Sequence, residues 1–122
     1  MPDRHIVEAF AAAVESNDHV GAIERFYAPD ASTRENQNDP RRGREALAAR
    51  ERAVLASVAG VETTRLSPIF IDGDHSAIHW RFAFTPKDNG PPRVMEEIAL
   101  QTWRGNELIA ERFFYDPAQM KG

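Results

Sequence analysis

The chain has 122 residues, of which 42% are hydrophobic, enough for one globular domain with one core and too few for two. Its formal net charge is −4, and its basic residues are interleaved with acidic ones, so nucleic acid is not an expected partner. The absence of cysteine excludes disulfide frameworks, thiolate zinc sites and cysteine nucleophiles. We therefore expect residues 1–122 to form a single domain.

The N-terminus does not have the pattern of a signal peptide, because Asp3, Arg4 and His5 are not followed by a long apolar core. The longest apolar run, residues 9–14, is too short to cross a membrane. These features predict a cytoplasmic protein with no membrane partner.

Apolar residues recur at helical spacing in three segments, residues 6–14, 20–27 and 47–58. Asp18 supplies cap chemistry for the second helix, and Pro29 is expected to end it. Three helices are therefore predicted in the first half of the chain.

The remaining segments have the composition of strands. A short strand is expected at residues 32–36, and longer ones at 62–71 and 77–85. Residues 93–117 have the pattern of a hairpin, because two runs rich in β-branched and aromatic residues flank Gly105-Asn106. The order predicts an α+β fold in which a curved antiparallel sheet follows the helices.

The strand at residues 77–85 shows which face of the sheet is interior. Trp80, Phe82 and Phe84 alternate with smaller or polar residues such as His79. The aromatic face should meet the helices, either as ordinary core or as the wall of a ligand cavity.

The hairpin carries charges on both faces, which is unusual for a strand pair with one solvated side. This pattern favours a sheet covered on both faces, by helices on one side and by a second subunit on the other. It predicts a cavity and a homodimer formed through the outer face of the sheet.

Three segments together resemble the nuclear transport factor 2-like superfamily, especially its SnoaL-like branch. They are F-Y-A-P-D-A-S-T-R-E-N at residues 26–36, P-R-R-G-R-E-A-L at 40–47 and G-N-E-L-I-A-E-R-F-F-Y-D-P at 105–117. The resemblance implies a cone-shaped, bent antiparallel sheet wrapped around three N-terminal helices, with a pocket at the open end. It also implies dimers through the outer sheet face.

The superfamily includes ketosteroid isomerases, polyketide cyclases and limonene epoxide hydrolases. The resemblance places the isomerase general base at Glu35, but the isomerase oxyanion groups fall at Ala11 and Ala99, which cannot donate hydrogen bonds. The catalytic aspartate of the cyclases falls near Phe114. Apart from Glu35, the relatives' catalytic groups are therefore expected to be missing.

If the hairpin register follows the family, one strand turns Glu97, Ala99, Gln101 and Trp103 inward, and the other turns Ala110, Arg112, Phe114 and Asp116 inward. Phe113 and Tyr115 are then expected on the outer face, where they would serve the dimer. Glu35 and Arg112 are then the pair of interest. They can form a structural salt bridge; alternatively, Glu35 is a catalytic base, or it binds ligand or lies exposed to solvent.

Other side chains are weaker candidates for ligand contacts. Asn36 is also a common turn residue, and Tyr27 is also the last member of an apolar stripe. The four histidines lack metal-ligand spacing, so no metal or cofactor is expected.

Two functional hypotheses follow. The first is a non-catalytic protein whose mostly apolar pocket, lined by Trp80, Phe82, Phe84 and Phe114, binds a small hydrophobic molecule. The alternative is an isomerase-, cyclase- or hydrolase-type enzyme in which Glu35 is the general base, while Arg112 and Gln101 steady developing negative charge.

Overall fold

The computed structural model describes residues 1–120. Its helices are α1 (Arg4–Glu15), α2 (His19–Phe26), α3 (Arg44–Ala56) and a closing 3₁₀ turn, η1 (Pro117–Met120). Its strands are β1 (Tyr27–Glu35), β2 (Arg41–Arg42), β3 (Gly60–Arg65), β4 (Phe70–Asp72), β5 (His75–Thr85), β6 (Arg93–Arg104) and β7 (Glu107–Phe114).

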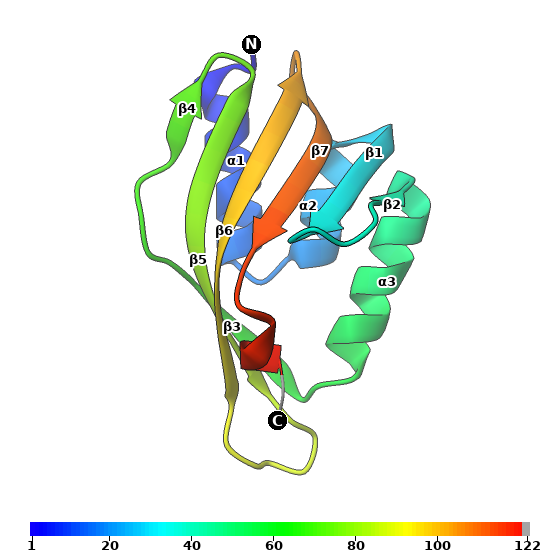
Figure 1. Cartoon of the computed structure of the whole chain (residues 1–122), viewed down its shortest axis with the longest axis vertical. Coiled ribbons are helices and arrows are strands. Elements are labelled where there is room, and N and C mark those ends of the chain that lie inside the picture. Colours follow the sequence, from blue (N-terminus) through cyan, green and yellow to red (C-terminus); the bar gives the residue numbers. More distant parts are fainter. Residues whose placement is uncertain (121–122) are drawn as a thin grey trace.

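The strands form one curled, unclosed sheet in the order β2-β1-β7-β6-β5-β3, with β4 paired to the side of β5. The helices α1 and α2 lie behind this sheet, and α3 stands beside β1 and β2 (Figure 1). The expected α+β architecture is confirmed. One pairing differs from a purely antiparallel sheet, because β1 runs parallel to β7, and the sheet is therefore mixed.

The junction between α2 and β1 lies earlier in the chain than Pro29. Asp18 caps α2 as expected, its side chain accepting a hydrogen bond from the Gly21 amide at 3.0 Å. The helix ends at Phe26, and Pro29 lies inside β1 instead of terminating the helix. The pairing of β1 with β7 is irregular between Tyr27 and Ser32, so a proline without an N–H is tolerated there.

The segment expected as one strand at residues 62–71 is split into β3 and β4. Pro68 lies in the gap between them, where it cannot donate a ladder hydrogen bond. The chain turns at Gly73-Asp74 between β4 and β5, and the predicted hairpin turn at Gly105-Asn106 is confirmed; Gly73 and Gly105 both have a φ of +59°. This left-handed conformation is one that glycine adopts without steric cost.

The interior face of β5 and β6 is the one that alternation predicts. Trp80 and Phe82 on β5 are buried, as are Glu97 and Gln101 on β6. His79 lies on the opposite face, with its Nε2 atom 3.4 Å from Glu96. The aromatic face of β5 therefore meets the helices.

The predicted face of β7 is wrong because this strand carries a bulge. Thr102 pairs with Ala110, whereas Trp103 pairs with Leu108, so Ile109 is an extra residue on β7. Because side chains alternate between the two faces of a strand, one inserted residue moves every later residue of β7 to the opposite face of the sheet. As a result Arg112 and Phe114, predicted to face inward, lie on the outer face.

Within residues 1–120, no helix is long and apolar enough to cross a membrane. The same residues contain no group of three or more histidine, aspartate or glutamate side chains arranged to hold a metal ion.

Candidate functional site

A cavity of about 200 Å³ lies between the concave face of the sheet and the helices. An apolar cavity of about 150 Å³ is large enough for benzene, so this one is large enough for a substituted single ring. Its lining comes from α1, α2 and α3, from β1, β2, β5, β6 and β7, and from η1. Among the lining residues are Tyr27, Glu35, Arg41, Arg50, Glu51, Trp80, Phe82, Phe84, Glu97, Glu111 and Phe113.

One wall is the row of aromatic residues on β5. The ring centroids of Trp80 and Phe82 are 6.2 Å apart, as are those of Phe82 and Phe84. His19 from α2 packs edge-on against Phe82 at 5.5 Å. The row lies on one face because alternate residues of a strand point the same way, and its rings can pack against a flat apolar ligand.

Glu97 lies beside this aromatic wall on the same face of the sheet, since it pairs with Trp80 across β5 and β6. The residue is only 6% exposed, and its carboxyl group forms no hydrogen bond with any group in residues 1–120. Burial, followed by the nearby charges of Glu111 and Glu35, raises the pKa of Glu97 to about 8. At neutral pH Glu97 is therefore mainly a protonated carboxylic acid that lines the cavity.

A second buried carboxyl group, Glu111 on β7, is fully hydrogen-bonded. Its Oε1 atom accepts a hydrogen bond from the hydroxyl of Tyr27, and its Oε2 atom accepts one from Gln101 Nε2 at 2.8 Å. Burial raises the pKa of Glu111, although these two hydrogen bonds act in the opposite direction. Burial and the charge of Glu111 also raise the pKa of Tyr27 well above its ordinary value.

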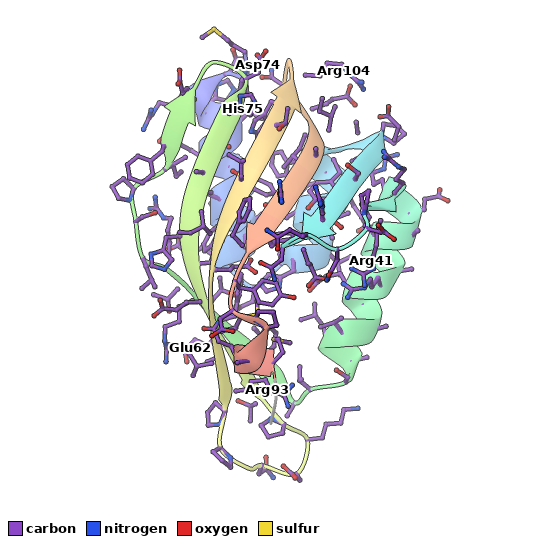
Figure 2. The ribbon with its side chains drawn as sticks, in the orientation of Figure 1. Arg41, Glu62, Asp74, His75, Arg93 and Arg104 are labelled. Carbon is purple, nitrogen blue, oxygen red and sulfur yellow. The ribbon has the colours of Figure 1, made fainter. Side chains whose placement is uncertain are left out.

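Glu35 lies near Arg41, which Figure 2 shows between the strand edge and α3. Arg41 Nη1 is 2.8 Å from Glu35 Oε2, Arg50 Nη2 is 3.6 Å from the same oxygen, and the Tyr115 hydroxyl donates to Oε1 at 2.8 Å. Burial alone raises the pKa of Glu35, but the bonds from Arg41 and Tyr115 and the arginine charges outweigh it and lower the pKa. Glu35 is thus an ionised, paired carboxylate.

The salt bridge between Glu35 and Arg112, one of the alternatives for this pair, does not form. Arg112 donates two hydrogen bonds to the carbonyl oxygen of Asn36, at 3.1 and 3.0 Å, and stacks over Phe114 at 4.6 Å. The bulge places both Arg112 and Phe114 on the outer face, and neither lines the cavity. Asn36 is a turn residue with a φ of +51° whose side chain accepts a hydrogen bond from the Tyr115 amide.

The remaining predicted residues lie inside. Trp80, Phe82, Phe84 and Tyr27 line the cavity, and Gln101 is buried behind it. Phe113 and Tyr115 were expected on the outer face. Phe113 instead lines the cavity, and the Tyr115 hydroxyl donates a hydrogen bond to Glu35.

Sequence reasoning missed both buried carboxylic acids as site residues. Glu97 belonged to the set correctly expected to face inward, and an acid at an inward position opposite a tryptophan was the available signal. Glu111 was hidden by the bulge, which no residue type in the hairpin marks.

Comparison with known proteins agrees with the fold. The model of the SnoaL-like domain matches residues 7–112. A candidate SnoaL-like polyketide cyclase from Mesorhizobium loti is 27% identical, with 91% of this chain and 97% of that chain covered and a TM-score of 0.76. No curated protein sequence matches the chain.

Two more distant structures share the fold. A protein with a ketosteroid isomerase-like fold from Catenulispora acidiphila, solved in complex with trimethylamine, is 23% identical over 93% of this chain and 86% of that one, with a TM-score of 0.75. An LEH-like epoxide hydrolase from M. tuberculosis is 18% identical over 95% and 84%, also with a TM-score of 0.75.

Proposed function

This chain belongs to the SnoaL-like domain family, and we propose that its cavity binds a small, mostly apolar molecule with an acceptor oxygen and transfers protons to or from it through Glu97. The observation that carries the proposal is the Glu97 carboxyl group, buried against Trp80 without a hydrogen-bond partner in residues 1–120. An unpartnered buried acid is costly to keep, and such groups cluster at functional sites.

The chemistry follows from the protonation state. A pKa of about 8 leaves Glu97 able to donate a proton near neutral pH and to accept one slightly above it. This is the requirement for a general acid–base group in isomerase-, cyclase- or hydrolase-type reactions, the classes found among relatives of this fold. The paired Glu35 is a weaker base, because two arginines and a tyrosine stabilise its ionised form.

A generic proton-transfer probe tests this role. 5-Nitrobenzisoxazole loses its C3 proton to a base as the N–O bond breaks, and the coloured cyanophenolate product is measured by absorbance. We expect turnover to rise with pH through about 8 and to fall about 100-fold in Glu97→Gln. Glu96→Gln is the matched control, since the neighbouring Glu96 is exposed on the opposite face.

Three results would change the assignment. Unchanged turnover in Glu97→Gln overturns the role of Glu97, and a loss confined to Glu35→Gln transfers the role to the base that the sequence predicted. Binding without any turnover favours the non-catalytic hypothesis, in which the cavity only holds a small hydrophobic ligand.

We also infer that two copies associate through the outer face of the sheet. Ile98 and Phe114 pair across β6 and β7 on that face and are 43% and 36% exposed, and Phe70 on β4 is 59% exposed. An isologous contact would bury this apolar patch against itself. Sedimentation equilibrium should give a dimer that Ile98→Asp dissociates, whereas a 13.7 kDa species for the unmodified chain would contradict the inference.

A further inference from the structure

A chain of buried hydrogen bonds crosses the concave face of the sheet and ends at the cavity. Trp103 Nε1 donates to Ser76 Oγ at 2.9 Å, and Ser76 Oγ donates to Gln101 Oε1 at 2.6 Å. Gln101 Nε2 then donates to Glu111 Oε2 at 2.8 Å, and the Tyr27 hydroxyl contacts Glu111 Oε1. The register aligns three of these residues, because Ser76 pairs with Gln101 and Gln101 with Glu111.

The direction of the chain is fixed at its far end. An indole N–H can only donate, so the Ser76 oxygen must accept from Trp103 and turn its own hydrogen toward Gln101. The Gln101 carbonyl is then occupied, and its amide nitrogen must face Glu111. Glu111 Oε2 can therefore only accept.

This direction of the hydrogen bonds decides whether the Tyr27 hydroxyl is available to a ligand as a hydrogen-bond donor or as an acceptor. Any proton carried by Glu111 must be on Oε1, the atom that faces the Tyr27 hydroxyl. If Glu111 is ionised, Tyr27 donates to it and keeps its lone pairs free; if Glu111 is protonated, the acid donates and the tyrosine O–H is free. The Tyr27 oxygen can thus pair with a ligand hydroxyl in either state, whereas an ether or carbonyl is accepted in only one.

Tyr27 and Glu111 lie where a ligand in the cavity could contact them. Tyr27 and Glu111 both line the cavity, while the other three members are buried behind it. The charged or titratable groups that act on the pair are Glu51 from α3, Glu97 from β6 and His19 from α2. Five polar groups in one buried chain are costly to desolvate, and each of the five is hydrogen-bonded to a neighbour in the chain.

We propose that Tyr27 and Glu111 form a hydroxyl-binding subsite, so that the ligand is a ring-sized molecule with a phenolic, enolic or alcoholic hydroxyl group in addition to the acceptor oxygen that meets Glu97. This inference rests on the proposed function, because it assigns the second polar group of the same ligand. Glu111 and its chain act as positioning groups, and Tyr27 is the residue that touches the ligand.

Matched ligand probes test the subsite. Binding of 3- and 4-hydroxyacetophenone to isotopically labelled protein is compared by NMR titration with that of the corresponding methyl compounds, which have similar shape and no hydroxyl group. We expect the better hydroxy isomer to bind about tenfold more tightly than its methyl counterpart, an effect of about one hydrogen bond. Tyr27→Phe should reduce this ratio to about one.

A second variant keeps the packing and changes only the polarity. In Glu111→Gln, the new amide accepts from Gln101 and donates to Tyr27, which leaves the tyrosine O–H permanently free. We expect this variant to bind the matching methoxyacetophenone nearly as well as the hydroxy compound at every pH, while the unmodified chain discriminates against the methoxy group once the pH is high enough to ionise Glu111. A purely structural role for Glu111 would instead weaken all probes by the same factor.

The outcomes separate this inference from the proposed function. A hydroxyl preference that survives Tyr27→Phe, or equal weakening of all probes in Glu111→Gln, overturns the subsite alone. Glu97→Met, which has a similar length and no donor, should weaken the binding of every ketone and leave the hydroxyl preference intact, and failure of that result counts against the role of Glu97. If the unmodified chain binds none of the probes, both proposals are overturned.

Discussion

Two carboxyl groups on the cavity wall, Glu35 on β1 and Glu97 on β6, have very different neighbours. Glu35 receives hydrogen bonds from Arg41 and Tyr115 and has Arg50 at 3.6 Å. Glu97 lies next to Trp80 on the adjacent strand and has no hydrogen-bond partner in residues 1–120. The pKa of Glu35 is lowered, and that of Glu97 is raised to about 8.

The difference shows that partners, more than position in a cavity, decide which acid can exchange a proton. Burial opposes ionisation of both groups, but at Glu35 nearby cations and a donor reverse the effect. Glu35 thus joins β1 and β2 to α3, while Glu97 has no hydrogen-bond partner in residues 1–120.

The largest expected effect is on the pH dependence of stability in Glu97→Gln. Between pH 4.5 and about 8 the folded chain binds more protons at Glu97 than the unfolded chain, so the free energy of unfolding falls as pH rises. A shift from 4.5 to about 8 corresponds to on the order of 4 to 5 kcal/mol. Glutamine removes this loss, so the variant should be the more stable protein at pH 9 and similar to the unmodified chain at pH 4.

Denaturant unfolding at several pH values measures the difference. Glu96→Gln is the control, and its stability should follow that of the unmodified chain across the range, because Glu96 is exposed. A constant difference between Glu97→Gln and the unmodified chain from pH 4 to 9 would mean that Glu97 is ionised in the fold.

A smaller effect of opposite sign is expected for Glu35→Gln. Because its folded pKa is lowered, Glu35 contributes stability that is present above pH 4.5 and lost as the pH falls through the folded pKa. The variant should lose about 1 kcal/mol at pH 7, the scale of a partly exposed ion pair, and the loss should disappear in acid. Thermal unfolding at a series of pH values below 7 tests the sign, and a loss that stays constant or grows as the pH falls below 4.5 would contradict it.

Much of the fold could be predicted from local patterns. The period-2 alternation around Trp80 gave the correct interior face of β5, and Gly105-Asn106 gave the hairpin turn. These features depend on neighbours in the chain, which the sequence displays directly. The parallel pairing of β1 with β7 depends on residues about 80 positions apart and could not be read in the same way.

The site was less predictable because a single residue changed it. The extra Ile109 moves Arg112 outward and Glu111 inward, and nothing in the residue types around it distinguishes a bulged strand from a regular one. The partners of Glu35 were missed for a related reason, since Arg41 lies on a two-residue strand that was not predicted from the sequence. Side-chain contacts across such short elements depend on the tertiary fold.

The smallest effects are expected from the two arginines that hold Glu35. Arg41 is hydrogen-bonded to the carboxylate at 2.8 Å, whereas Arg50 is 3.6 Å from it, and both side chains are 45% exposed. Arg41→Gln should therefore raise the pKa of Glu35 more than Arg50→Gln does, and each should cost no more than about 0.5 kcal/mol of stability. Carbon-detected NMR titration of the Glu35 carboxyl group measures the order. Equal rises in the two variants would show that charge, and not the hydrogen bond, keeps Glu35 ionised, and would weaken the contrast with Glu97.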